Sequence, residues 1–211
     1  MTIIGRLGMV RHMPVAMPSP IHAICVYCGS AKGGNPAFVE NAARLGKALA
    51  ENGIRLVYGG GSVGLMGVLA RSVLKHGGQV TGIIPGHLHH VEITQEGLSE
   101  LIVVPSMHER KRQMFERADA FVSLPGSIGT LDETIEVITW RQLKLHDKPI
   151  LIVNDQDYWT PFLTLIQHMV AEGFASAATA ELFQVVKNID EILPELAKTR
   201  LPKLPDREEL L

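Results

Sequence analysis

Short β-branched runs alternate with longer helical stretches from Ile21 onward, and this alternation is the strongest constraint on the fold. It is the pattern of parallel strands joined by crossover helices. Strands are predicted where an apolar run is bounded by glycine, proline or a polar residue, at 23–28, 54–58, 80–84, 101–104, 120–124, 150–153 and 183–186. The sequence therefore predicts an α/β fold: a doubly wound, Rossmann-like parallel sheet of about seven strands with helices on both faces.

Helices are predicted in the gaps between these strands. Asn35 and Pro36 suit the cap and first position of a helix that ends at Asn52-Gly53. Ser106 and Glu109 form an S-x-x-E capping box at the start of another. The remaining helices are predicted at 62–77, from 129 to about 145, at 160–173 and at 189–198. Ligands of such folds bind beyond the carboxyl ends of the strands, so the site is expected there.

Length and composition limit the classes of protein that fit. The 211 residues, 46% apolar and 20% charged, suffice for one well-buried domain, expected at 21–200 between a poorly ordered extension (1–20) and a tail (201–211). The net charge of −2 provides no basic field for nucleic acid. No apolar run approaches the ~20 residues of a membrane span, and residues 1–20 lack the apolar stretch of a secretory signal. We expect neither nucleic-acid nor membrane partners, and a cytoplasmic location.

Two groups of metal-ligand residue types have structural explanations. Cys25 and Cys28 spell C-x-x-C inside a predicted strand, where residues three apart point to opposite faces. Free core thiols are therefore expected, and not a redox or zinc pair. His87, His89 and His90 form a cluster without a nearby cysteine or well-spaced acid. Neither a metal nor a cofactor is predicted.

Three predicted strand-to-helix junctions are rich in glycine and belong on the same edge of the sheet. They lie at 28–30, 59–67 and 125–130. Glycines let the backbone approach a phosphate, and the free N–H groups and partial positive charge of a helix start attract it. The third junction closes an apolar strand and is expected to start a helix with acid in its first turn, followed directly by Glu133. It predicts a phosphate site beside a carboxylate.

The middle junction formally satisfies the dinucleotide fingerprint G-x-G-x-x-G with Gly59, Gly61 and Gly64. The acid expected about 20 residues further on is missing, since the next acid is Glu92. The junction also follows the second predicted strand and not the first. No G-x-x-x-x-G-K-[ST] occurs in the chain. A nicotinamide or flavin oxidoreductase and a P-loop NTPase are therefore not expected.

Three blocks resemble the signature blocks of the LONELY GUY family, the cytokinin riboside 5′-monophosphate phosphoribohydrolases. They are Y-G-G-G-S-V-G-L-M-G at 58–67, M-H-E-R-K at 107–111 and P-G-S-I-G-T-L-D-E at 125–133, within a resemblance that spans roughly residues 21–196. The resemblance implies hydrolysis of the N-glycosidic bond of an N6-modified adenosine 5′-monophosphate or AMP. It also implies a homodimer, with larger assemblies in some members, and catalytic roles for Arg110 and Glu133.

The chemistry of this reaction suits both residues. Breaking the bond builds positive charge on the sugar, which Glu133 can stabilise while it activates water. The guanidinium of Arg110 can hold phosphate or ribose oxygens, or orient Glu133. Alternatively, Arg110 is a surface charge and Glu133 a helix-dipole acid. The residues expected to bind substrate or phosphate are Gly126, Ser127, Ile128, Gly129, Thr130, Gly59, Gly60, Gly61, Ser30, Met107 and Lys111.

Ser127 departs from the family pattern, which has a second glycine there. A positive φ at this position would cost serine about 1 kcal/mol, whereas at negative φ its hydroxyl can add a phosphate hydrogen bond.

Two other functions fit parts of the sequence. A non-catalytic nucleotide or cofactor carrier needs only the glycine loops, so the presence of both Arg110 and Glu133 favours the enzyme. A lysine decarboxylase, a label attached to this family, would need a lysine Schiff base to pyridoxal phosphate and a partner for the ring nitrogen. The P-G-x-x-G-T block explains neither, so this function is not expected.

Overall fold

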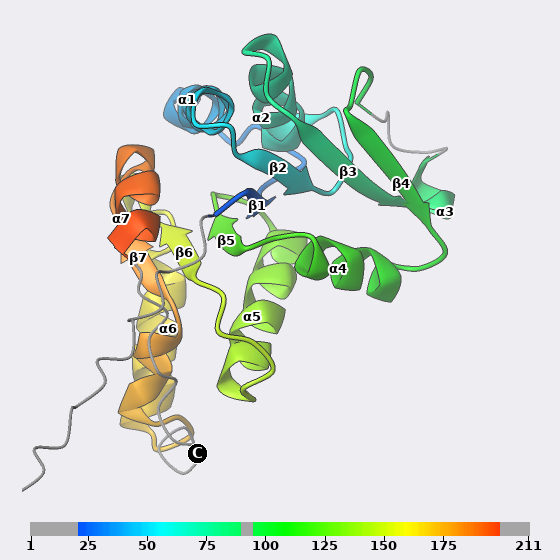
Figure 1. Ribbon diagram of the computed structural model, residues 1–211. Helices are drawn as coiled ribbons and strands as arrows, with labels where there is room; N and C mark the ends of the chain where they lie inside the picture. Colours follow the sequence, from blue (N-terminus) through cyan, green and yellow to red (C-terminus); the bar gives the residue numbers. More distant parts are fainter. Residues whose placement is uncertain (1–20, 90–94, 199–211) are drawn as a thin grey trace, which may run out of the picture.

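The computed structural model describes residues 21–89 and 95–198, so the predicted extension at 1–20 and tail at 201–211 lie outside the described residues. Seven parallel strands form one sheet at the centre of the described chain (Figure 1). They are β1 (Ala23–Tyr27), β2 (Arg55–Tyr58), β3 (Val80–Pro85), β4 (Glu100–Val104), β5 (Ala120–Ser123), β6 (Ile150–Val153) and β7 (Gln184–Val186). Every predicted strand is confirmed, with bounds that agree to within one residue.

The strand order β4-β3-β2-β1-β5-β6-β7 makes the sheet doubly wound, as predicted. The chain moves outward from β1 to β4, crosses back, and continues on the other side of β1 with β5. In register, Cys25 of β1 lies between Val57 of β2 and Phe121 of β5. The direction of winding reverses between β1 and β5, and such a switch point opens a crevice at the carboxyl ends of the two strands.

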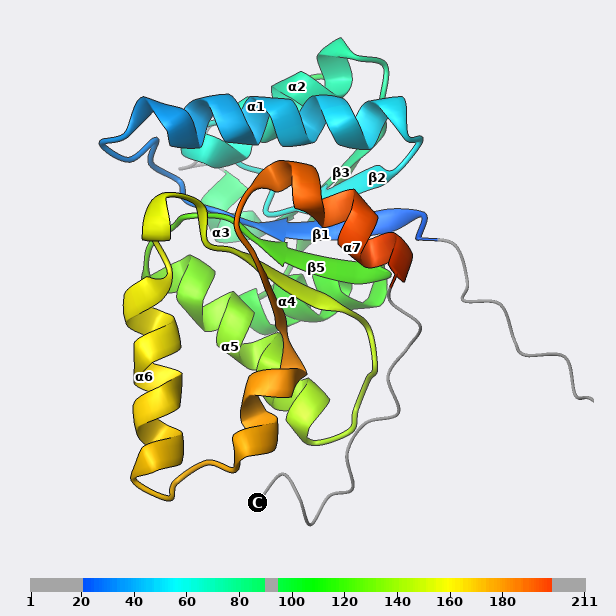
Figure 2. The same ribbon diagram turned by 90° about the vertical axis from the view of Figure 1, so that its left-hand side faces the viewer.

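Helices cover both faces of the sheet (Figure 2). One face carries α1 (Pro36–Glu51), α2 (Gly64–Lys75) and α7 (Ile192–Lys198), and the other carries α4 (Met107–Glu116), α5 (Ile128–Gln142) and α6 (Thr160–Ala171). Alternate residues of β1 supply the two hydrophobic cores, with Ile24 and Val26 in one and Ala23, Cys25 and Tyr27 in the other. This two-sided burial explains why the strands are continuously apolar.

Four short helical segments escaped prediction or changed a predicted helix. They are α3 (Gly86–His89), η1 (Asp155–Asp157), η2 (Ala177–Leu182) and η3 (Ile189–Glu191). The helix predicted at 189–198 is divided into η3 and α7, because Asn188 caps a 3₁₀ turn through Asp190 N. No helix within 21–89 or 95–198 is long and apolar enough to cross a membrane.

The two cysteines lie as expected. Both are buried free thiols, and they belong to opposite cores: Cys25 packs with the α4–α6 side and Cys28 with the α1–α2 side. The prediction of free core thiols is therefore confirmed.

Helices α1 and α2 pack closely at Gly46, where a Cβ would lie 2.7 Å from both Leu69 O and Ser72 Cβ. Gly46→Ala is therefore expected to lower the free energy of unfolding by about 1–2 kcal/mol, despite alanine's higher helix propensity. Urea denaturation measures the change. Glu40→Ala, at an exposed position of the same helix, should stay within about 0.5 kcal/mol of wild type. An equal or greater stability of Gly46→Ala would contradict the close helix packing.

Candidate functional site

The three glycine-rich junctions meet at the carboxyl edge of the sheet, as predicted. Gly29 N donates a 3.0 Å hydrogen bond to Pro125 O, which joins the junction after β1 to the junction after β5. Leu65 N, at the start of α2, donates a 2.9 Å bond to Gly29 O. A Cβ at Gly64 would overlap the backbone of Ser30, so the first two junctions are in direct contact. The backbone segments predicted to bind a nucleotide are therefore gathered at the switch point.

The β5–α5 turn, residues 125–130, is open to an anion. Ser127 is the N-cap of α5 with φ −93°, and its side chain makes no capping hydrogen bond. Serine therefore carries no left-handed strain at this position. Within the described parts of the chain, no protein acceptor takes the backbone N–H groups of Ser127, Ile128, Gly129 and Thr130. Free donors at a helix start are a favourable environment for phosphate.

The expectation of acid in the first turn of α5 is wrong. The helix begins at Ile128, before Gly129, so Asp132 and Glu133 lie in the second turn. Ser127 can cap a helix, and this moves its start toward the strand. At this depth the side chain of Glu133 is only 12% exposed, so the alternative of an exposed helix-dipole acid does not hold.

Glu133 faces Arg110 across the space between α5 and α4. The distance from Arg110 Nη2 to Glu133 Oε1 is 3.8 Å, with side chains 11% and 12% exposed. Arg110 Nη2 also lies 3.4 Å from Gly59 O, and Nη1 lies 3.8 Å from Met107 Sδ. The Nε of Arg110 is buried without an acceptor among the described residues. Arg110 is therefore not a surface charge, and it connects the β2–α2 junction to Glu133.

Burial raises the pKa of Glu133 to about 7. The attraction of Arg110 lowers it, and the negative charges of Asp132 and Glu136 raise it further. A carboxyl group with a pKa near the working pH can both accept and return a proton, which suits general acid–base catalysis. Perturbed carboxyl groups in clefts are frequent at functional sites.

Lys111 lies beside this pair and contacts carboxylates of α5. Its ammonium lies 3.1 Å from Asp132 Oδ2 and 3.2 Å from Glu136 Oε2. The side chain is 17% exposed. These contacts hold α4 against α5, which fixes the separation of Arg110 and Glu133.

The start of α4 is set by its cap. Ser106 Oγ accepts a 3.2 Å bond from Glu109 N, while the Glu109 carboxylate bonds to Arg112 and Gln113. One half of the predicted capping box is thus confirmed. The cap fixes where Met107 and the residues that follow it point.

Two residues of the site edge were not predicted. The Tyr158 hydroxyl donates a 2.5 Å bond to Gly126 O in the β5–α5 turn. Arg71 Nη1 donates a 2.8 Å bond to Ser62 O in the β2–α2 junction. Neither belongs to a recognisable motif. For Tyr158 the available signal was its place just after the carboxyl end of β6.

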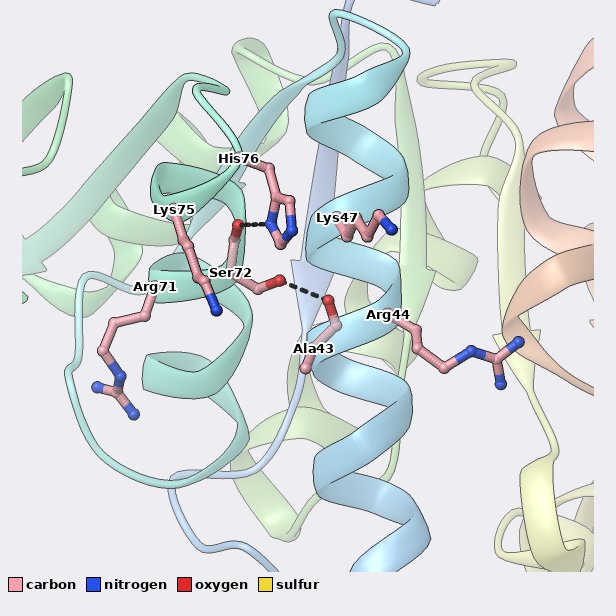
Figure 3. Close-up of a pocket in the computed structure, with 7 residues that line it drawn as sticks. All are labelled: Ala43, Arg44, Lys47, Arg71, Ser72, Lys75 and His76. Atoms are coloured by element: carbon pink, nitrogen blue, oxygen red, sulfur yellow. Dashed lines mark hydrogen bonds between the residues drawn. The ribbon is translucent and has the colours of Figure 1, made fainter.

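A groove with a volume of about 320 Å³ lies elsewhere, between α1 and α2 (Figure 3). Several of its cations already have partners: Arg44 with Asp190, Lys47 with Glu51, and Arg71 with Ser62 and Gln95. None of the predicted site residues lines it, and we assign it no ligand. Its lining residues are Ala43, Arg44, Lys47, Arg71, Ser72, Lys75 and His76.

Within residues 21–89 and 95–198, no three His, Cys, Asp or Glu side chains gather as a set of metal ligands. His90, part of the predicted histidine cluster, lies outside the described residues.

The fold and site together define a Rossmann-like α/β protein with an open phosphate-type turn beside a buried carboxylate–guanidinium pair. A family model described as "Possible lysine decarboxylase" matches residues 66–196. The rice cytokinin riboside 5′-monophosphate phosphoribohydrolase LOG is 46% identical over 186 residues, covering 84% of this chain and 76% of that protein. The chain belongs to the LONELY GUY (LOG) family.

Further relatives are named for the same activity. Arabidopsis thaliana LOG7 is 46% identical and covers 82% of this chain and 80% of that protein. The enzyme of Rhodococcoides fascians is 44% identical, and the match covers 83% of this chain and 88% of that protein. Among solved structures, a molybdenum cofactor binding protein from Rippkaea orientalis matches with a TM-score of 0.64 at 20% identity. The match covers 84% of this chain and 96% of that chain. The Moco carrier protein of Chlamydomonas reinhardtii matches with a TM-score of 0.62 at 18% identity, and the match covers 82% of this chain and 94% of that chain. These structures establish the fold alone.

Proposed function

We propose that this chain hydrolyses the N-glycosidic bond of a cytokinin riboside 5′-monophosphate or of AMP, releasing the free base and ribose 5-phosphate. The single observation that carries the proposal is the buried pair of Glu133 and Arg110, 3.8 Å apart, beside the open β5–α5 turn. The activity for which relatives of 44–46% identity are named supports the same reaction. A carrier would need the turn but not this pair.

In the proposed reaction the 5′-phosphate accepts hydrogen bonds from the N–H groups of residues 127–130, with the Ser127 hydroxyl as a further donor. The C1′–N bond breaks, its electron pair leaves with the base, and positive charge grows on the sugar. Ionised Glu133 stabilises that charge and takes a proton from the water whose oxygen bonds to C1′. The departing base gains a proton from the medium, and Glu133 then releases to the medium the proton it took from water, so the net reaction adds one water and gives neutral base and ribose 5-phosphate.

Arg110 has two roles in this proposal. Its guanidinium keeps Glu133 oriented, and its fork, together with the Nε–H that has no acceptor among the described residues, can hold ribose or phosphate oxygens. The glycines at 59–61, together with Ser30 and Met107, form the remaining wall of the substrate site. Lys111 supports the site indirectly, because its ion pairs with Asp132 and Glu136 hold α4 against α5.

The test incubates purified protein separately with AMP and with isopentenyladenosine 5′-monophosphate and follows free base by chromatography. Wild type should release base, and Glu133→Gln and Arg110→Ala should lose at least about 100-fold in kcat/KM. The more rapidly cleaved nucleotide identifies the preferred base. Tight nucleotide binding without base release would instead identify a carrier.

The reaction should depend on the ionised form of Glu133. Because its pKa is raised to about 7, kcat/KM is expected to rise about tenfold per pH unit below that value and to level off above it. A pH series of initial rates measures the profile. A flat profile from about pH 5 to 8 would exclude Glu133 as the base.

We further propose a homodimer that forms through the α5–α6 side of the molecule, and a cytoplasmic location. Large apolar side chains are exposed on that side, whereas the exposed residues of α1 and α2 are mainly polar. Sedimentation velocity should give twice the chain mass, and Ile135→Glu should shift it to the monomer. A monomeric wild type would contradict the dimer. Beyond Ile128 at the start of α5, the exposed apolar residues of α5, α6 and the segments that follow them are Ile135, Leu143, Leu145, Leu165, Met169 and Phe174.

A further inference from the structure

The loop between β6 and α6, residues 154–159, reaches the β5–α5 turn and touches it through a hydroxyl group. Tyr158 donates a 2.5 Å hydrogen bond to the carbonyl oxygen of Gly126. The described peptide bonds are all trans, so this carbonyl and the N–H of Ser127 point in opposite directions. A bond that fixes the carbonyl therefore also fixes the direction of the Ser127 N–H.

Contacts with α1 hold Tyr158 in place. The carboxylate of Asp155, only 8% exposed, accepts a hydrogen bond from Asn41 Nδ2 of α1. The ring of Phe38, also on α1, meets the Tyr158 ring edge to face at 5.5 Å between centroids. In Figure 2 the starts of α1 and α5 and the β6–α6 connection lie on the same side of the molecule. The loop is thus fixed against a neighbouring helix before it reaches the turn.

The loop adopts an unfavourable backbone conformation to make this contact. Gln156 and Asp157 have φ of 53° and 56°, in the left-handed region that residues with side chains rarely adopt. Such strain persists only where the surrounding structure imposes it, and it is concentrated at functional sites. Two consecutive residues with positive φ immediately before Tyr158 indicate that the surrounding packing imposes its placement at an energetic cost.

We propose that Tyr158 is a positioning residue for the 5′-phosphate of the substrate. Its hydroxyl holds the Gly126–Ser127 peptide so that the Ser127 N–H faces the phosphate together with the N–H groups of Ile128 and Gly129. The proposal rests on the proposed function for the identity of the substrate. Its geometry concerns phosphate binding, which is measurable without hydrolysis.

The test measures equilibrium binding of AMP, with inorganic phosphate and adenosine as competitors, in a Glu133→Gln background that does not turn over. Adding Tyr158→Phe should weaken the binding of AMP and of inorganic phosphate by about tenfold each. The reason is that the Ser127 N–H is then no longer held in the direction of the charged phosphate. The affinity for adenosine, which has no phosphate, should change by less than about twofold. In the otherwise wild-type enzyme the same substitution should raise KM and leave kcat nearly unchanged.

Ser72→Ala is the matched control. It also removes a hydroxyl that donates a 2.5 Å bond to a carbonyl, that of Ala43, but between α1 and α2. AMP affinity should be unchanged in this variant. An unchanged AMP affinity in Tyr158→Phe, equal weakening of AMP and adenosine, or no AMP binding by the parent would each overturn the positioning role. If wild type releases no base but Tyr158→Phe weakens AMP binding as expected, only the hydrolase function is contradicted.

Discussion

Glu133→Gln should abolish base release and at the same time make the protein more stable at alkaline pH. The pKa of Glu133 is raised by burial to about 7 in the folded chain, from an ordinary value of 4.5. Below about pH 4.5 both folded and unfolded chains hold the proton. Between about pH 4.5 and 7 the unfolded chain has lost its proton while the folded chain still holds it, so stability falls across this window and levels off above about pH 7, where the buried group is ionised as well.

Glutamine resembles the protonated carboxyl, and the raised pKa already includes the attraction of Arg110. The variant should therefore gain on the order of 2 kcal/mol in free energy of unfolding at about pH 8.5, and little at about pH 4.5. Urea denaturation at both pH values measures the difference. Glu40→Gln, exposed on α1, should show no such pH-dependent gain. A variant no more stable than wild type at the higher pH would show that the carboxylate is not penalised by burial.

Gly59→Ala is expected to lower kcat/KM by about 100-fold with almost no loss of stability. A Cβ at Gly59 would overlap Nη2 of Arg110, and its next neighbours are Arg110 Cζ at 3.0 Å and Met66 Sδ at 3.4 Å. The overlapped atom is the end of a flexible side chain, so the guanidinium can move aside at low cost in folding. It would then lose its position beside Glu133. Steady-state kinetics and thermal denaturation on the same preparation separate the two effects.

Gly34→Ala is the control for this prediction, because no atom lies within 4 Å of a Cβ at that position. It should retain wild-type activity. If the effect of Gly59→Ala acts through Arg110, adding it to Arg110→Ala should cost little more activity. Full additivity of the two substitutions, or full activity of Gly59→Ala, would show that Gly59 does not set the guanidinium position.

The strands were predictable because their sequence is nearly continuous in apolar, β-branched residues and is bounded by turn residues. Parallel strands covered on both faces have this pattern, and the shortness and β-branched composition of the runs distinguish them from buried helices. Helix boundaries were less certain. Ser127 and Gly129 can both stand at a helix start, and only the observed backbone decides for a start at Ile128.

The positions predicted for the site came from motifs, and the structure gathers them at one edge. Residues without a motif were missed. Tyr158 contacts Gly126 across 32 positions of the chain, and nothing local in its sequence indicates that bond. Lys111 was expected to bind substrate or phosphate, and its two carboxylate partners on α5 became visible only through packing.

The sequence alone determined the order of strands and helices, the three glycine-rich junctions and the family, because these depend on residue type and spacing along the chain. Only the tertiary structure decided that Ser127 has a negative φ, that Arg110 is buried against Glu133, and that the pKa of Glu133 is raised. The physical reason is that burial and electrostatic pairing depend on which surfaces pack together, and segments far apart in the chain supply those surfaces.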